Sequence, residues 1–318
     1  MTMEALHEPV LMEEVLTALA VAPTDTVIDA TLGGAGHFAR LLAALGEGGT
    51  IIGIDADPEA LERARETYAE DRRPERPVAH LVNDNFRNLA RMLERLHLST
   101  ADAILFDLGW SGYQVASSRG FSFTDPTQPL LMTYAASGET AADLVNSATE
   151  EELADLIFTY GEERFARPIA RAIVAARREE RILTTGALVA AIEGGTPEWY
   201  HHRRIHPATK TFQALRIAVN DEFGALKGGL AAALHALAPG GRLAILTFHS
   251  AEDRIVKQAF REAERAGLGS LPHKKPIVPT RVEIAHNRRA RSAKLRVFVR
   301  ASLPSHAVIG HTPFLSYA

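Results

Sequence analysis

The stretch VIDATLGGAGH at residues 27–37 and the stretch IIGID at residues 51–55 decide the fold of this 318-residue chain. Each holds an apolar run that is typical of a buried strand and that reaches an acid, Asp29 in the first and Asp55 in the second. Glycines follow Asp29, and a helix is expected from there to about residue 45. This order of strand, glycine turn, helix and strand predicts a doubly wound α/β sheet that holds an adenosine-containing ligand.

The glycine turn leaves the identity of that ligand open. Residues 34–39 satisfy G-x-G-x-x-[GA], and Asp55 lies 19 residues after Gly36, a pattern that permits a nicotinamide dinucleotide. Glycines here can also serve a tight turn with no ligand at all. Two acids favour S-adenosylmethionine: Asp29, placed to meet an ammonium group, and Asp107, which ends a strand at 101–107 and opens a long loop. In either case we expect Asp55 to accept hydrogen bonds from ribose hydroxyls, unless it only caps the next helix.

Strands and helices alternate up to residue 107, and the alternation then stops. We expect a strand at 78–82 and a helix at 86–96, whereas residues from about 112 to 207 are helical and loop-like with no clear strand. The alternation resumes with one long helix that carries apolar side chains from Leu215 to Leu230. The expected elements after it are a strand at 242–248, a helix at 252–266 and a strand at 295–301.

Composition narrows the class of protein. Hydrophobic residues make up 46% of the chain and charged residues 23%, as in globular proteins, and no run approaches the ~20 apolar residues that span a bilayer. The first residues lack the basic and then apolar pattern of a secretory signal. The absence of cysteine excludes disulfides and thiolate metal sites and is in keeping with a cytoplasmic protein. We expect no metal at His201, His202 and His206, which lack acids at ligand spacing.

A net charge of −4 confines nucleic-acid binding to local basic patches. One candidate patch is 201–204 with Lys210, and the other comprises Arg288, Arg289, Arg291, Lys294 and Arg296. Trp110, Trp199 and Tyr200 are suited to stacking on splayed bases. Charge runs are also common on solvated faces that bind nothing.

Several blocks together resemble one family. They are HEPVL at 7–11, GGAGH at 33–37, DLG at 107–109, RGFSF at 119–123, YGEE at 160–163, HPATKTFQALRIAVN at 206–220, FHSAEDR at 248–254 and RARSAKLR at 289–296. On these blocks the chain is identified as a member of the bacterial 16S ribosomal RNA cytosine-N4 methyltransferases, called RsmH or MraW. The resemblance runs from about residue 7 to 300, and the stretch from residue 301 falls outside it.

The resemblance implies methyl transfer from S-adenosylmethionine to the N4 atom of a cytidine in the decoding centre, within an assembled small (30S) subunit. It implies a Rossmann-like methyltransferase sheet formed by 1–112 and 208–318, with a helical substrate-recognition insertion at 113–207. A homodimer is compatible with the sequence and no membrane partner is expected. The cofactor-binding residues that it implies are Ala35, Gly36, His37, Asp55, Phe86, Asp107 and Gln114.

The catalytic candidates nearest the expected amine are Asp107 and the side chains of residues 111–114, and Asp107 is preferred. The lone pair of the cytosine amino group is delocalised into the ring, so positioning and acceptors for its hydrogens are needed. Asp107 is predicted to serve both the cofactor and this amine, and the absence of cysteine agrees with direct transfer. The chain lacks the Pro-Pro-Tyr run that DNA amino methyltransferases often use, which disfavours a DNA substrate.

Three departures from the family leave alternatives open. WSGYQVA stands at 110–116 where VSSPQLD is usual, QPLLMTYA stands at 128–135 where GPLDMRMD is usual, and Arg288 replaces a proline. The first two changes lie in loops expected near the target base. A ribosome-assembly factor with weak or no catalysis, or an N-methyltransferase with another substrate, is therefore the alternative to a cytidine methyltransferase.

Overall fold

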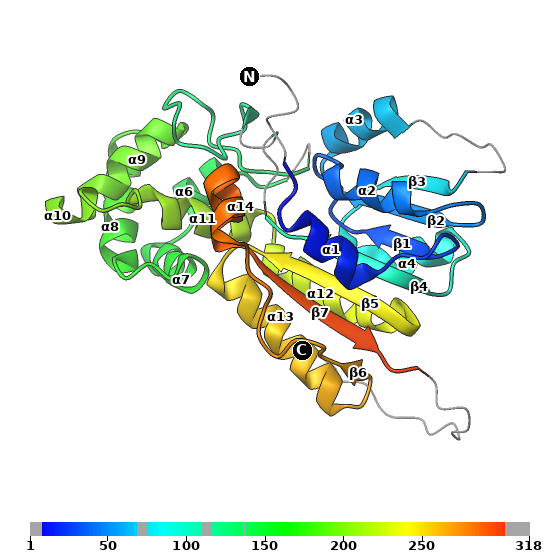
Figure 1. Ribbon diagram of the computed structural model, residues 1–318. Helices are drawn as coiled ribbons and strands as arrows, with labels where there is room; N and C mark the ends of the chain where they lie inside the picture. The colour runs from blue at the N-terminus through cyan, green and yellow to red at the C-terminus, as the bar shows by residue number, and fades with distance from the viewer. Residues whose placement is uncertain (1–7, 69–75, 110–112, 114–115, 136–137, 303–318) are drawn as a thin grey trace.

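The computed structural model describes residues 8–68, 76–109, 113, 116–135 and 138–302, and Figure 1 shows a twisted sheet flanked by helices. In this part of the chain the sheet has seven strands in the order β3-β2-β1-β4-β5-β7-β6. Their bounds are β1 Thr26–Asp29, β2 Thr50–Asp55, β3 Val78–Asn83, β4 Ala101–Asp107, β5 Leu237–Thr247, β6 Gly269–Ser270 and β7 Lys294–Arg300. Strands β1 to β5 run parallel, and β7 is antiparallel to β5 and β6.

The doubly wound α/β sheet predicted from the sequence is confirmed. A dinucleotide-binding sheet has the order 3-2-1-4-5-6, and here an antiparallel β7 is inserted between β5 and the edge strand β6. The result is a Rossmann-like sheet with one antiparallel strand added near its edge. Among the described residues, no helix is both long and apolar enough to cross a bilayer.

The three central strands β1, β2 and β4 end in Asp29, Asp55 and Asp107, which lie at the same edge of the sheet. Ile28 of β1 pairs in register with Ile52 of β2 and with Ile104 of β4. The strand order reverses here, because β2 and β3 lie on one side of β1 and β4 and β5 on the other. Ligands of such sheets bind beyond the carboxyl ends of the strands at this reversal, where Asp29 and Asp107 lie.

Helices cover both faces of the sheet, because successive strand residues point to opposite sides. On one face Val27 and Ile51 pack with α1, α2 and α3, and on the other Ile28 and Ile52 pack with α4, α12 and α13. Burial on both faces stabilises each such side chain by roughly 1.5–3 kcal/mol and explains the unbroken apolar runs of the strands. The helices are α1 Met12–Leu19, α2 Gly36–Ala44, α3 Pro58–Tyr68, α4 Leu89–Arg95, α12 Glu222–Ala236 and α13 Ser250–Arg265.

The insertion is helical, as the sequence predicts, and packs around a third apolar cluster. Its helices are α6 Ala141–Ser147, α7 Glu150–Gly161, α8 Ala166–Glu179, α9 Thr185–Gly194 and α10 Glu198–His201, seen left of the sheet in Figure 1. Thr149 and Glu152 form a capping box that starts α7. The cluster also takes in Phe212 and Leu215 of α11 (Ala208–Val219), beyond residue 207 where the insertion is predicted to end.

One helix prediction is wrong in a way that matters for the site. The apolar spacing from Leu215 to Leu230 predicts a single helix, but the chain breaks between α11 and α12, where Asp221 has a left-handed φ of 45°. The side chain of Asn220 fixes the break, because its amide donates to Met132 O at 2.8 Å and its oxygen accepts from Tyr134 N at 2.9 Å. These long-range bonds replace the continuation of the helix.

Three further differences concern the last third of the chain. Strand β5 begins at Leu237 rather than 242, because Leu237 already pairs with Ala101; the register then shifts before Arg242 pairs with Ala103, so residues 238–241 form an irregularity within the strand. Helix α8 begins at Ala166, two residues before Pro168, although proline favours the first position of a helix. The short elements β6, α14 (Arg281–His286) and the 3-10 helix η3 (Arg288–Ser292) were not predicted, since two to six residues carry too little periodicity.

Candidate active site

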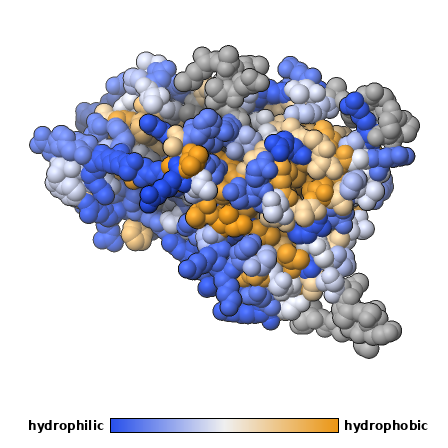
Figure 2. Space-filling model, viewed as in Figure 1, coloured by the Kyte–Doolittle hydropathy of each residue, from blue (hydrophilic) through white to orange (hydrophobic). Residues whose placement is uncertain are grey.

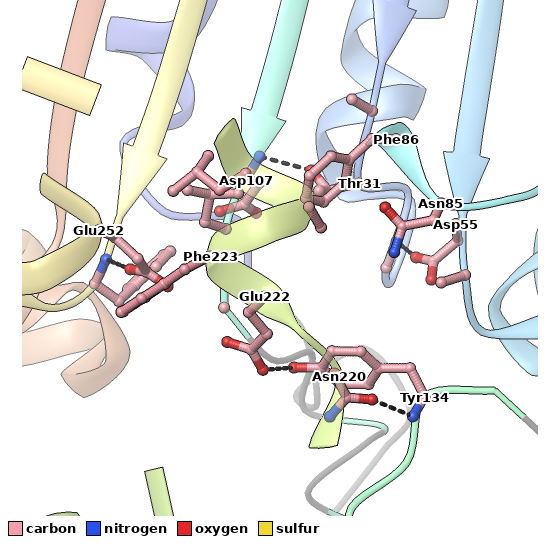
Figure 3. Close-up of a pocket in the computed structure, with 18 of the residues that line it drawn as sticks. Thr31, Asp55, Asn85, Phe86, Asp107, Tyr134, Asn220, Glu222, Phe223 and Glu252 are labelled. Carbon is pink, nitrogen blue, oxygen red and sulfur yellow. Dashed lines mark hydrogen bonds between the residues drawn. The ribbon is translucent and has the colours of Figure 1, made fainter. Parts of the chain in front are cut away.

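An open pocket lies beyond the carboxyl ends of β1, β2 and β4 and encloses about 1040 Å³, including solvent at its mouth. Figure 3 shows its two walls. The first, from the sheet edge, includes Thr31, Asp55, Phe86 and Asp107, and the second comes from the loop that carries Tyr134, the start of α12 and the start of α13. The pocket therefore joins the sheet to the segment that flanks the insertion.

Asp55 occupies the end of β2, as predicted for a ribose-binding acid. Its two carboxylate oxygens accept hydrogen bonds from the backbone N–H of Gly33 at 2.7 Å and of Asp57 at 2.8 Å. Burial raises the pKa of Asp55 to about 6, and these two hydrogen bonds oppose that rise. Asp57, and not Asp55, caps α3, because its Oδ1 accepts from the N–H of Glu59. Asp55 thus fastens the glycine turn to β2 and keeps lone pairs toward the pocket.

Backbone conformation and packing explain the small residues of the glycine turn at 33–36. Gly33 and Ala35 have left-handed φ angles of 50° and 59°, so the turn needs residues with small side chains. A Cβ at Gly36 would overlap the ring of Pro9. Gly33 lines the pocket, whereas Ala35, Gly36 and His37 stand behind the lining. The structure thus places these three predicted cofactor residues at the start of α2, one layer from the cavity.

His37 lies buried between two acceptors. Its Nε2 is 3.1 Å from the carbonyl oxygen of Val10, and its Nδ1 is 3.3 Å from Oδ2 of Asp107. A carbonyl oxygen and a carboxylate oxygen both accept hydrogen bonds, so this placement favours an imidazolium with a proton on each ring nitrogen. Burial lowers the pKa of His37, but the hydrogen bond and negative charge of Asp107 prevail and raise it above its usual value. His37 therefore fixes the orientation of the Asp107 side chain.

Asp107 has one oxygen left over. Its backbone N–H donates to the hydroxyl of Thr31 at 2.6 Å, and its Oδ2 faces His37. Its Oδ1 is buried and has no hydrogen-bond partner among the described residues. A buried carboxylate oxygen without a donor is costly, so an N–H group of a bound molecule is its natural partner. Among the groups of the pocket, this unpaired oxygen is the strongest indication that a ligand binds here.

Asp29 lies behind these groups and not in the pocket wall. It is 1% exposed, and its Oδ1 accepts from the N–H of Thr31 at 3.2 Å. Burial raises the pKa of Asp29 to about 7, and the nearby His37 opposes that rise. Direct contact with an ammonium group is therefore not what this geometry offers. Asp29 instead adds a second acid beside His37.

Phe86 forms the apolar part of the sheet-side wall. Its ring packs edge-on against Phe106 at 5.2 Å between centroids. A Cβ at Gly229 of α12 would lie 2.6 Å from the Phe86 ring, so the helix presses this ring toward the pocket. A half-buried phenyl face beside Asn85 and Asp55 is suited to a flat heterocycle such as adenine.

A polar cluster on α11 and α12 builds the opposite wall. The guanidinium of Arg216 donates to both oxygens of Glu222 at 2.8 and 2.9 Å, and the Tyr134 hydroxyl donates to Glu222 Oε1 at 2.8 Å. Burial and the charge of Glu222 raise the pKa of Tyr134 well above its usual value, so it remains a donor. Glu222 is thereby fixed as an acceptor that faces the cavity (Figure 3).

The start of α13 closes the pocket. His249 is the N-cap of α13. Its Nδ1 accepts from the N–H of Glu252, and its Nε2 lies 2.9 Å from Glu252 Oε1. Glu252 also accepts from the N–H of Phe248 at 2.9 Å. Despite burial, which raises it, the hydrogen bond and charge of His249 lower the pKa of Glu252. Phe248 and Phe223 line the cavity as two aromatic rings beside these acids.

The charge of the pocket discriminates between ligands. The carboxylates that line it are those of Glu8, Asp55, Asp107, Glu222 and Glu252, against one lining arginine, Arg289. Arg216 and His37 pair with Glu222 and Asp107 from behind the lining and offset part of this negative charge. The excess that remains favours a sulfonium or ammonium group over the pyrophosphate of a dinucleotide. In the described part of the chain, no cluster of three or more histidines and acids forms a metal site. The residues present thus fit S-adenosylmethionine and disfavour a nicotinamide dinucleotide.

Sequence reasoning found one wall and missed much of the other. Asp55, Phe86 and Asp107 line the pocket as predicted, and Gln114 lies outside the described residues. Tyr134, Glu222 and Glu252 were not proposed as site residues. The polar run 220–222 inside an otherwise apolar helix period was the signal available for Glu222, whereas Tyr134 reaches the site only through tertiary contacts.

Comparison with known proteins gives a consistent result. The model of a family described as the MraW methylase family matches residues 4–301. The chain is 49% identical to the ribosomal RNA small subunit methyltransferase H of Deinococcus radiodurans, over 94% of this chain and 91% of that protein. It is 47% identical to the protein of the same name from Geobacter sulfurreducens, over 91% of this chain and 97% of that protein.

Proposed function

This chain belongs to the MraW methylase family, and we propose that it methylates the N4 atom of a cytidine in the decoding centre of small-subunit ribosomal RNA. The names of its relatives support the small-subunit RNA as substrate. The observation that carries the proposal is the buried Asp107 Oδ1 without a donor, set between an adenosine-type wall and a second acidic wall. That arrangement suits a donor cofactor and an acceptor amine in one cavity.

S-adenosylmethionine is the cofactor, and it supplies a methyl group on a positively charged sulfur. Asp55 would hold its ribose hydroxyls, and the ring of Phe86 would lie against its adenine. Ala35, Gly36 and His37 stand one layer behind the cavity, and we propose that they act on the cofactor by fixing the glycine turn and, through His37, the side chain of Asp107.

The acceptor amine is the demanding part of the reaction. Asp107 Oδ1 can accept a hydrogen bond from the exocyclic amine, which biases the nitrogen lone pair out of the ring plane and toward the methyl group. The same oxygen can hold the proton that the amine releases, with the positive charge of His37 3.3 Å from Oδ2 to balance the carboxylate. This positioning converts a weak nucleophile into a reactive one.

The second wall is suited to the base itself. Phe223 and Phe248 provide apolar faces for a flat ring. The backbone N–H of Tyr134 donates to Asn220 Oδ1, and Arg216 fixes Glu222 by its ion pair. A base that is paired or stacked in RNA would have to be extruded to reach this depth, at a cost of a few kcal/mol. An assembled subunit that presents the base in this way is the expected partner, and the cytoplasm is the expected location.

Methyl transfer to small subunits tests the proposal. Subunits from a strain that lacks the gene are incubated with the protein and methyl-labelled S-adenosylmethionine, and the nucleosides of their RNA are identified. Label in N4-methylcytidine supports the proposal. Cofactor binding without turnover would show a non-catalytic assembly factor instead, and label in another nucleoside would show another acceptor.

A further inference from the structure

The two basic patches noted in the sequence divide into paired and unpaired groups in the structure. Asp253 binds Lys294 at 3.0 Å and Arg296 at 2.7 Å, and Lys210 donates to the carbonyl oxygen of Glu162 at 2.6 Å. Arg289 faces the main pocket. These four cations therefore serve internal contacts or the catalytic cavity, and they do not form a free basic surface.

Of the four remaining arginines, Arg203 lies over the ring of Tyr200 and the other three converge on one place. Arg204 follows α10 in the insertion, whereas Arg288 and Arg291 belong to η3 near the end of the chain. All three are exposed, and together with Ile284 of α14 they line one open hollow. Within the described residues, no carboxylate forms a salt bridge with any of the three. Positive charge gathered without a counter-charge is unfavourable in the free protein.

We propose that Arg204, Arg288 and Arg291 form an arginine triad that binds the phosphodiester backbone of single-stranded RNA beside the target base. Guanidinium groups match phosphate oxygens through paired N–H donors, and three of them surround one hollow. This inference rests on the proposed RNA substrate and adds to it the surface that holds the RNA strand. The triad joins the insertion to the last part of the sheet domain, so one bound strand contacts both.

The segment that carries Arg204 also presents an aromatic platform. Trp199 is 55% exposed, and the guanidinium of Arg164 lies 4.8 Å from the centre of its ring. Tyr200, predicted to stack on bases, is instead 4% exposed, donates its hydroxyl to Glu163 at 2.6 Å and supports the ring of Trp199. Trp110 lies outside the described residues. Aromatic faces next to arginines are typical of surfaces that bind single-stranded nucleic acid, since bases stack on the rings while phosphates meet the cations. Figure 2 shows hydrophilic surface toward α10 bordering a hydrophobic spot at α14. A free phosphate ion would make no use of this platform.

Salt dependence gives the magnitude of the expected effect. Each phosphate contact to a single strand lowers the slope of log affinity against log salt by about 0.7. At about 0.1 M salt this corresponds to roughly fivefold per arginine, and to on the order of 100-fold for all three. The Arg204→Gln/Arg288→Gln/Arg291→Gln variant should therefore bind RNA on the order of 100-fold more weakly, with a slope that is shallower by about 2.

The test uses the full chain and a single-stranded RNA oligonucleotide of mixed sequence, between about 50 and 200 mM salt. The matched control is Arg95→Gln, since Arg95 is an exposed arginine at the end of α4, on the opposite face of the sheet from η3. Calorimetry with S-adenosylmethionine should give the same affinity for all three proteins. This result shows that the folds and the cofactor pocket are intact.

The proposal is overturned if the triple variant keeps the RNA affinity and salt slope of Arg95→Gln. It is also overturned if inorganic phosphate binds at the triad while RNA affinity does not change in the triple variant. Whether wild-type protein methylates subunits is read separately, so a failure of the proposed reaction leaves the RNA-binding result interpretable. Methylation of subunits by the triple variant should recover at high subunit concentration, because the defect lies in binding.

Discussion

Replacement of Asp55 by alanine should weaken the binding of S-adenosylmethionine by more than tenfold. In the free protein this carboxylate accepts two backbone hydrogen bonds, from Gly33 at 2.7 Å and from Asp57 at 2.8 Å. With the cofactor bound it should accept the ribose hydroxyls as well. Hydrogen bonds to a charged group contribute about 1.5–3 kcal/mol each. Loss of one ribose bond alone thus corresponds to roughly tenfold to more than 100-fold in the dissociation constant.

The control for this measurement is Asp102→Ala. Asp102 also accepts a backbone N–H bond, from Thr26 at 2.8 Å, but at the amino ends of the strands, the edge of the sheet away from the pocket. Both variants lose a carboxylate at the edge of the same sheet, so their effects on stability should be comparable. Isothermal titration calorimetry should show a changed dissociation constant for Asp55→Ala only. An affinity for Asp55→Ala within error of wild type would refute the ribose role.

Three further predictions concern groups around the pocket. Asp107→Asn should lower the single-turnover rate of methylation, measured with saturating subunits, by about 100-fold or more. A rate within about threefold of wild type would exclude Asp107 as the acceptor of the amine hydrogen. Asp29→Asn should stabilise the protein more at pH 8 than at pH 5. In the wild type the pKa of Asp29 is about 7 in the native state and 3.8 in the unfolded state. The wild-type native state therefore loses stability, at most about 4 kcal/mol, as the pH rises from about 4 to 7, and asparagine removes this loss. Urea unfolding at both pH values checks this, and an equal effect at both would contradict it. Arg216→Met leaves Glu222 without its partner and should lower the free energy of unfolding by about 3 kcal/mol or more. The double variant Arg216→Met/Glu222→Gln should recover part of this stability in thermal unfolding. No recovery in the double variant would argue against the ion pair as the cause.

The sheet was predictable because its signals are local. Strands β1, β2 and β4 are apolar runs buried on both faces, and each ends in an acid at the carboxyl edge. Asp55 and Asp107 could be placed on one edge from strand order alone. The cap of α3 also carries a local signal, because Asp57 is followed by Pro58 at the first position of the helix.

The second wall was not predictable because it depends on contacts across long stretches of chain. The break after α11 is stabilised by bonds between Asn220 and residues 132 and 134, and the apolar period on either side conceals it. Tyr134 lies in a loop that departs from the family pattern, yet its hydroxyl and its N–H are both engaged by this wall. The convergence of Arg204 with Arg288 likewise brings together segments that no local pattern relates.

The central claim is that this cavity transfers a methyl group to the amino nitrogen of a cytidine. Small subunits from a gene-deletion strain, incubated with methyl-labelled S-adenosylmethionine and the purified protein, test it most directly when their RNA is digested and its nucleosides are separated. The account predicts label in N4-methylcytidine with wild-type protein, and on the order of 100-fold slower labelling with Asp107→Asn. Unlabelled RNA, or label in a nucleoside other than N4-methylcytidine, would contradict it.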